Sequence, residues 1–378
     1  HYPLRRQRQM CIRDSVMAVS NPFAVLTNFL PSDWQQSVYQ GQQNGKAAFS
    51  LVHKNIHSQV RQFLNAAPDP QVNQLSPELL NSLTTARDRL LAEDWQDAEG
   101  GIYPKSLLFD DDWLNFIQYY PQVWLDKVAV WQKIRDQNHQ QFAPEIDLNG
   151  YPDYYLQNFH HQTDGYLGEM SANLYDLQVE ILFNGTSDAM RRRILKPIKQ
   201  KLGSNGDRRL AILDVACGTG RTLKFLAAAL PNASLHGLDL SPTYLRKAQQ
   251  ILNQAGVSLP QLLQGNAENL PYQDDLFDLV TNVYLLHELP APVRQTVMAE
   301  CFRVLKPGGI LMVMDSIQVN DRPEWEPMLE NFPQMFHEPY YRHYIEDDIV
   351  TRLTKAGFEA IEECPHCFSK SWLAVKPA

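Results

Sequence analysis

The sequence predicts an α/β fold with an open, mostly parallel sheet in the C-terminal half, preceded by an all-α N-terminal domain. From Arg208 onward, short apolar runs alternate with helix-competent runs, which is typical of a parallel sheet. A small-residue turn, Ala216 to Gly220, follows the first apolar run. Residues 17–150, in contrast, show helical periodicity without glycine-rich turns.

Residues 1–16 are set apart from the fold. They contain four arginines and one acid, a composition that also suits a transit peptide. However, Arg6 to Ser15 reads like a translated sequencing adapter, so we interpret residues 1–16 as an assembly artefact and Met17 as the natural start.

Residues 17–150 are predicted to form the helical N-terminal domain. Ser32 is the expected N-cap of an early helix, and Pro121 is expected to break a later one. An aromatic and apolar face is spaced at helical intervals through Trp113, Phe116, Ile117, Tyr120 and Trp124.

Residues 151–205 are predicted to be a helical lid or linker, with helices over 171–183 and 189–200. The polar, glycine-containing segment 158–167 precedes these helices.

Residues 206–378 carry the sheet. The expected strands are 209–215, 234–239, 260–265, 277–283 and 309–316. The expected helices between them are 219–230, 242–254 and 291–304, the second of which starts with an N-cap and proline at Ser241-Pro242. A helix at 346–356 and a terminal hairpin of strands 357–363 and 370–376 close the chain.

Bulk properties exclude several classes of protein. The formal net charge of −9 argues against binding nucleic acid over a large surface. No apolar run approaches the roughly 20 residues that span a bilayer. Five cysteines in 378 residues do not suggest a disulfide framework and fit a reducing compartment, so we expect a cytoplasmic protein.

The glycine turn is the strongest functional signal. A strand, a tight turn and a helix hold nucleotide-like ligands over the carboxyl end of a parallel strand. Asp239 ends the next apolar run, nineteen residues after Gly220, where an acid binds a ribose diol. A nicotinamide site is disfavoured because Leu223 stands where its third glycine belongs, and no phosphate-binding Gly-x-x-x-x-Gly-Lys occurs.

Together these signals resemble motif I and the following acidic strand of class I S-adenosylmethionine (SAM) dependent methyltransferases. The segment Gly265 to Tyr272 resembles the adenine-binding turn of that family, usually Gly-Asp-Ala-x-x-Leu-Pro-Phe, with Asn266 in place of the aspartate. Arg303 to Leu311 resembles the turn before its fifth strand, where Pro-Gly-Gly reverses the chain. The resemblance covers about residues 155–376. It implies a Rossmann-like seven-stranded methyltransferase sheet with an antiparallel last strand, and SAM as the cofactor.

The resemblance also implies which residues bind SAM, and it implies that the 151–205 helices fold over the cofactor as a lid. The candidate cofactor-binding residues are Asp214, Ala216, Cys217, Gly218, Gly220, Asp239, Leu240, Asn266, Ala267, Glu268, Asn282, Thr163 and Tyr166.

His287, Glu288 and Tyr340 are the candidate catalytic residues. In the family, residues just after the fourth strand face the methyl group, so His287 could orient or deprotonate an acceptor. The alternative is a His–Glu pair that caps the next helix. We expect the acceptor pocket between His287, the 159–166 segment and the flap Phe336 to Tyr344.

The function predicted is methyl transfer to a small, lipophilic or aromatic acceptor, because Gly265 to Tyr272 resembles the quinone- and sterol-type group. The alternative is a SAM-binding regulatory or scaffold protein without turnover, in which the N-terminal domain does the work.

Two motifs are interpreted as coincidental, and no metal site is expected. Cys364-Pro365-His366-Cys367 matches the Cys-x-x-Cys motif of redox proteins, but it is expected in the turn of the terminal hairpin. That turn is expected to lie far from the cofactor end of the strands. His53 and His57 stand four residues apart without the glutamate of a zinc hydrolase helix.

Overall fold

The fold is taken from a computed structural model, which describes residues 27, 30–110, 113–203, 209–258 and 260–378. The expectation for residues 1–16 lies outside this part of the chain.

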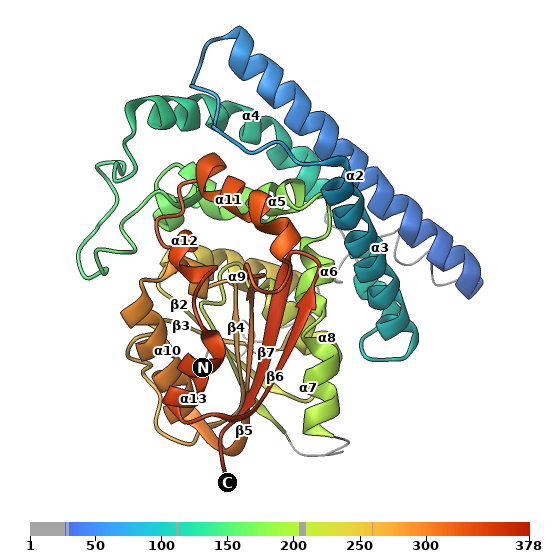
Figure 1. The fold of residues 1–378 in the computed structure, drawn as a ribbon. Helices are drawn as coiled ribbons and strands as arrows, with labels where there is room; N and C mark the ends of the chain where they lie inside the picture. The colour runs from blue at the N-terminus through green and yellow to red at the C-terminus, as the bar shows by residue number, and fades with distance from the viewer. Residues whose placement is uncertain (1–26, 28–29, 111–112, 204–208, 259) are drawn as a thin grey trace, which may run out of the picture.

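The C-terminal half is one seven-stranded sheet in the order β3-β2-β1-β4-β5-β7-β6 (Figure 1). β1 to β5 are parallel, and β7 runs antiparallel between β5 and β6, which confirms the predicted fold class. The strands are β1 Ala211–Val215, β2 Ser234–Asp239, β3 Gln261–Gln264, β4 Phe277–Val283, β5 Leu305–Ser316, β6 Glu359–His366 and β7 Ser369–Val375.

Helices cover both faces of the sheet. Apolar side chains from α7, α8 and α9 form one core with alternate residues of β1, β4 and β5, such as Ile212 and Met312. α10, α11 and α13 form the other core with the intervening residues, such as Leu213 and Val313. The helices are α7 Leu195–Leu202, α8 Arg221–Ala229, α9 Pro242–Gln254, α10 Ala291–Val304, α11 Glu326–Met335, α12 Tyr341–Tyr344 and α13 Ile349–Ala356.

The Pro-Gly-Gly segment differs from its prediction. β5 begins directly after α10, and its pairing with β4 jumps from Leu305 to Ile310. The intervening residues form an irregularity inside the strand, where Gly308 takes a positive φ of 75° and its N–H bonds the carbonyl of Lys376. They therefore interrupt a strand and do not reverse the chain.

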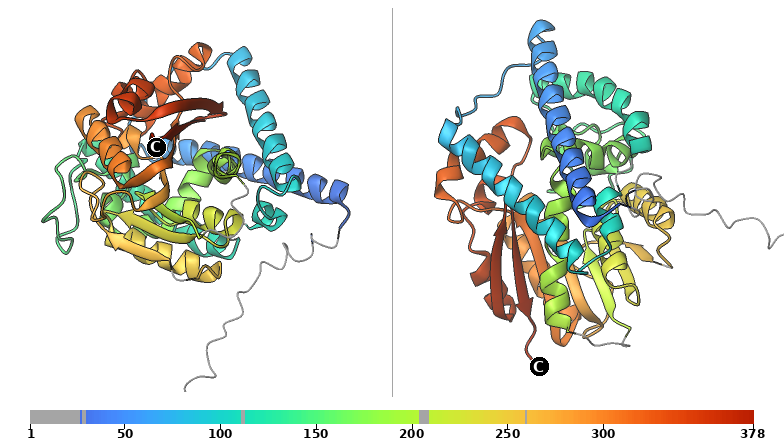
Figure 2. Two further views of the ribbon diagram at one scale, coloured as in Figure 1. Left: turned by 90° about the horizontal axis from the view of Figure 1, so that it is seen from below. Right: turned by 90° about the vertical axis from the view of Figure 1, so that its right-hand side faces the viewer.

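The N-terminal helices pack on the sheet domain and share its core. They are α2 Ser32–Phe63, α3 Pro77–Glu99 and α4 Trp113–Asp136, and the first and third lie beyond the upper edge of the sheet (Figures 1 and 2). Tyr39 and Trp95 belong to the same apolar cluster as Ile212. Arg192 of α6 (Ser187–Arg192) joins the two parts through a buried ion pair with Asp94 of α3.

Two N-terminal expectations are wrong. Pro121 lies inside the continuous helix α4, and Pro31, not Ser32, is the N-cap of α2. The Ser32 hydroxyl instead donates to Glu99 of α3. The aromatic face of α4 packs as predicted where it is described: the Phe116 and Tyr120 rings lie 4.9 and 5.2 Å from the ring of Phe49.

The terminal hairpin forms as predicted, but β6 extends to His366, so Cys364 lies in the strand and only Cys367 lies in the turn. The turn is also not where we expected it. Ser369 pairs with Ser316 at the carboxyl end of β5. Because β7 is antiparallel to β5, the turn at Cys367 lies at the carboxyl edge of the sheet. No helix among the described residues is long and apolar enough to cross a membrane.

Candidate functional site

A pocket lies at the carboxyl ends of β1, β2 and β4, beneath residues of the 151–205 segment. Among the candidate site residues, the pocket is lined by Ala216, Cys217, Gly218, Asp239, Leu240, Asn266, Ala267, Tyr166 and Glu288. The sheet thus brings the glycine turn, the acidic strand end and the turn after β3 to one place, as the topology of parallel strands requires.

The glycine turn is held by Asp239. The N–H groups of Gly218 and Ser241 donate to the two oxygens of the Asp239 carboxylate, each at 2.8 Å. Burial raises the pKa of Asp239 to about 6, although these two bonds oppose the shift. Gly218 takes a positive φ of 53°, and a Cβ built there would meet no atom within 4 Å. A ligand can therefore approach this backbone closely.

Gly220 and Asp214 support the turn from behind and do not line the pocket. A Cβ on Gly220, at φ 79°, would lie 3.0 Å from the Cβ of Ala248, so this glycine allows α8 and α9 to pack. Asp214 accepts a 2.6 Å hydrogen bond from the Thr281 hydroxyl. Burial raises the pKa of Asp214 to about 7.

The turn after β3 is closed by its own side chains. The Asn266 amide oxygen accepts from the N–H of Glu268 at 2.9 Å, and its amide nitrogen donates to the Glu268 carboxylate. That carboxylate also accepts from the hydroxyl of Tyr154 at 2.8 Å. Glu268 therefore joins the turn to the 151–205 segment and does not line the pocket.

Two further candidates lie outside the pocket lining. Thr163 donates to Asp126 of α4 at 2.7 Å, so its hydroxyl contacts the N-terminal helices, not the site expected for it. Asn282 is 1% exposed, and neither of its amide atoms has a hydrogen-bond partner among the described residues. It pairs in register with Val215, immediately before the glycine turn.

Sequence reasoning missed most of the aromatic wall. Tyr154, Tyr155, Phe159, Tyr175, Tyr244 and Tyr284 line the pocket together with Arg191. Arg191 is 6% exposed, and its guanidinium lies 5.5 Å from the ring centre of Tyr284. The density of tyrosines over residues 151–175 was the signal available in the sequence.

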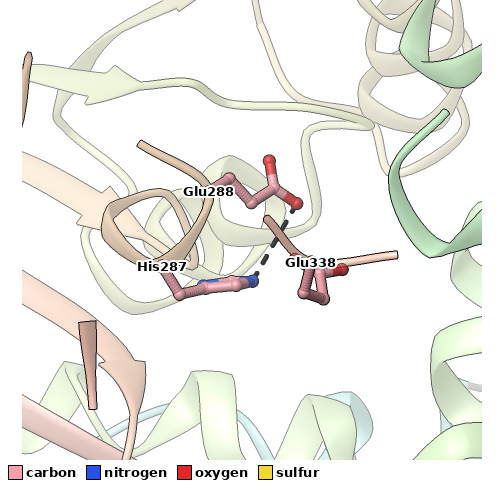
Figure 3. A group of neighbouring side chains, drawn as sticks. All are labelled: His287, Glu288 and Glu338. Atoms are coloured by element: carbon pink, nitrogen blue, oxygen red, sulfur yellow. Dashed lines mark ion pairs between the residues drawn. The ribbon is translucent and has the colours of Figure 1, made fainter. Parts of the chain in front are cut away.

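His287 and Glu288 lie in a short 3-10 helix, Leu286–Glu288, and belong to a cluster of His and Glu side chains beside the pocket (Figure 3). His287 Nδ1 lies 2.6 Å from a carboxylate oxygen of Asp315, and its Nε2 lies 3.9 Å from Glu288. Burial lowers the pKa of His287, but Asp315, Glu288 and Glu338 outweigh it and raise the pKa to about 9.

The alternative that this pair caps the next helix is wrong. Pro290 is the N-cap of α10, and no side chain caps it. Glu288 instead accepts a short hydrogen bond from the hydroxyl of Tyr166.

The three segments expected around the acceptor do meet. His160 Nδ1 lies 2.7 Å from Glu338 and its Nε2 lies 3.5 Å from Glu288. Burial lowers the pKa of His160, but the two glutamates outweigh it and raise the pKa to about 10. Tyr340 is in this flap but does not line the pocket, and its backbone carbonyl accepts a bond from Arg294.

In the two motifs interpreted as coincidental, the histidines and Cys367 take part in packing. His53 Nδ1 lies 3.1 Å from the Tyr120 hydroxyl, and His57 accepts from the Trp131 indole at 3.1 Å. Cys364 is exposed and Cys367 half-buried, and both thiols are free.

Comparison with known proteins gives matches over the sheet domain and beyond it. A protein family described as "Methyltransferase domain" matches residues 212–309. An uncharacterized methyltransferase of Synechocystis sp. is 33% identical over 166 residues, 43% of this chain and 73% of that protein. A demethylmenaquinone methyltransferase of Lactiplantibacillus plantarum is 30% identical over 220 residues, 53% of this chain and 89% of that protein. A phthiotriol/phenolphthiotriol dimycocerosates methyltransferase of Mycobacterium ulcerans is 38% identical over 122 residues, 32% of this chain and 43% of that protein.

Proposed function

Because the chain belongs to the class I SAM-dependent methyltransferases, we propose that it transfers the SAM methyl group to a small, lipophilic or aromatic acceptor. The observation that carries the proposal is a single pocket that joins the glycine turn and Asp239 to a wall of tyrosine and phenylalanine side chains.

The residues present fit SAM. The Asp239 carboxylate lines the pocket and, after accepting two backbone N–H groups, keeps lone pairs for a ribose diol. Arg191 places a buried cation in the pocket lining, where it can bind a carboxylate. Asn282, whose two amide atoms have no hydrogen-bond partner among the described residues, pairs in register with Val215 just before the same turn. When bound, SAM supplies the electrophilic sulfonium methyl group.

The acceptor end is assigned to the side of the pocket formed by the 151–175 segment and Glu288. Aromatic walls with a few polar groups are typical of small-molecule sites. The hydroxyl of Tyr166 and the carboxylate of Glu288 are the polar pair there. Relatives named for demethylmenaquinone and for phthiotriol dimycocerosates support a lipophilic acceptor.

This chain's own residues would contribute alignment, exclusion of water and, for an acceptor that loses a proton, a nearby base. In-line transfer needs the nucleophile held close to the S–CH3 bond, and holding it there supplies most of the catalysis. Residues of the 151–175 segment line the pocket, where they would exclude water, and Glu288 lines it with His287 beside it.

Incubation with methyl-labelled SAM tests the proposal. The acceptor panel contains a demethylated quinol, a simple phenol and a polar amine such as glycine, and labelled product is separated by organic extraction. We expect label in the quinol or phenol product, and less of it with the Asp239→Ala variant. Label in the amine alone would contradict the lipophilic acceptor. SAM binding without transfer to any of the acceptors would favour the scaffold alternative.

A further inference from the structure

A group of three potential metal ligands lies beside the pocket. A nitrogen of His287 and one oxygen each of Glu288 and Glu338 all lie within 4.8 Å of one another. Figure 3 shows the imidazole and the two carboxylates gathered around one point. They come from two segments of the chain, the 3-10 helix after β4 and the loop between α11 and α12.

Glu338 is a fully buried carboxylate that has an ion pair but no well-directed hydrogen bond among the described residues. His160 is the nearby cation, at 2.7 Å from one oxygen. A buried carboxylate is costly unless it is paired and hydrogen-bonded or coordinates a metal.

We propose that His287, Glu288 and Glu338 bind a divalent transition-metal ion of the Zn²⁺ type. The carboxylates of Glu288 and Glu338 face the cation of His160, and that of Asp315 faces His287. A +2 ion on a neutral His287 would therefore balance the remaining charge. Imidazole nitrogen together with carboxylate oxygen is a ligand set that suits Zn²⁺ and its neighbours over Mg²⁺ or Ca²⁺. This site differs from the expectation of no metal, which was drawn from the Cys364/Cys367 and His53/His57 motifs alone.

Asp315 orients the histidine in this site. Its carboxylate lies 2.6 Å from His287 Nδ1 and also accepts the N–H of Leu286 at 2.7 Å. A hydrogen bond at Nδ1 leaves Nε2 as the ligating atom, and metal-binding histidines are usually held by such a carboxylate. Asp315 is therefore a positioning residue and His287 the ligand.

The site has three protein ligands, so it keeps an open coordination position. Three ligands with one position for water or substrate are typical of catalytic zinc, whereas structural zinc is closed by four. Glu288 lines the pocket, so the open position would face an oxygen or nitrogen of the acceptor. This last step rests on the proposed function, but binding of the metal does not.

Calorimetric titration of the chelator-treated full chain with Zn²⁺ tests the inference, and Co²⁺ absorption provides a second readout. We expect one equivalent bound per chain, and no binding of Mg²⁺ or Ca²⁺ at the same concentrations. Glu338→Gln and His287→Gln should each weaken the binding of Zn²⁺. The loss of affinity should exceed the roughly 10–100-fold expected when a supporting residue is lost. Asp315→Asn should weaken it within that range, and circular dichroism establishes that each variant is folded.

Glu346→Gln is the matched control, because Glu346 is exposed and lies eight residues after Glu338. It should bind Zn²⁺ as the wild type does. Failure of the folded wild type to bind one equivalent of Zn²⁺ would overturn the inference, as would unchanged affinity in both Glu338→Gln and His287→Gln. SAM affinity is measured in parallel on metal-free protein. Loss of SAM binding would count against the proposed function, and loss of Zn²⁺ binding against the metal site.

Discussion

Asp315 and His287 form a buried pair across two neighbouring strands' ends, with 2.6 Å between a carboxylate oxygen and Nδ1 of the imidazole. Asp315 is on β5 and is 0% exposed, while His287 follows β4 and is 8% exposed. A carboxylate at Nδ1 fixes the orientation of the ring and directs Nε2 toward Glu288 and the pocket. The proposed acceptor side of the pocket is therefore built where β4 and β5 end side by side.

His287→Ala is expected to lower turnover by about 10²–10⁴-fold, the usual contribution of a positioned acid or base, with the base form predominant only above a pH of about 9. SAM affinity should stay nearly intact, because His287 is not among the residues that line the pocket. Steady-state kinetics and calorimetry on one purified variant measure both. Unchanged turnover per folded molecule would show that His287 only supports the structure.

Asp239→Ala is expected to weaken SAM binding, with about 1.5–3 kcal/mol lost for each hydrogen bond to the charged carboxylate. The variant also releases the N–H of Gly218, so its melting temperature is measured together with SAM affinity by calorimetry. Asp136→Ala, at an exposed position on α4, is the control. Wild-type affinity in folded Asp239→Ala would remove the basis of the site assignment.

Asp214 is expected to make stability fall as pH rises. Its pKa is about 7 in the folded protein against an ordinary value of 3.8, so the folded state binds more protons between those values. The contribution of Asp214 to the free energy of unfolding is therefore present at low pH and is lost as pH rises through about 7.

Asp214→Asn removes this titration but keeps an acceptor for Thr281. Its stability relative to the wild type should therefore be higher at pH 8 than at pH 5, as urea denaturation can measure. If the free energies of unfolding of the variant and the wild type differed by the same amount at both pH values, the raised pKa of Asp214 would be contradicted.

Arg192→Met is expected to destabilise the protein by about 3–5 kcal/mol, because it leaves the buried carboxylate of Asp94 without its cation. Arg89→Met is the control: Arg89 pairs with Glu93 of the same helix, but its side chain is 76% exposed. That change should stay within about 0.5 kcal/mol. If chemical denaturation gave the same loss of unfolding free energy for Arg192→Met and Arg89→Met, the packing of α3 would not depend on the buried pair.

The double replacement Cys364→Ser and Cys367→Ser is expected to leave methyl transfer unchanged. Burial raises the pKa of Cys367 to about 12 and also raises that of Cys364, whereas reactive thiols have a lowered pKa. The turn lies at the carboxyl edge of the sheet, the edge that also forms the pocket. Loss of transfer with SAM binding intact would make these thiols functional.

The sequence by itself determined the sheet domain and the cofactor side of the pocket. The strands 234–239 and 277–283 were predicted with the bounds that the structure gives, since alternation of apolar strands and amphipathic helices is a local pattern. Asp239 and Gly218 could be placed in one pocket because parallel strands bring their carboxyl ends to one edge, wherever the rest of the chain packs.

Only the tertiary structure decided what surrounds the other side of the pocket. Thr163 and Glu268 have residue types suited to a ligand, but Asp126 and Tyr154 from distant segments bind them instead. No pattern in the sequence indicated Glu338 as a ligand, because it meets His160 and His287 only when the flap folds over the sheet. Helix and strand patterns depend on neighbours in the chain, whereas the partners of a buried polar side chain depend on which segments pack together.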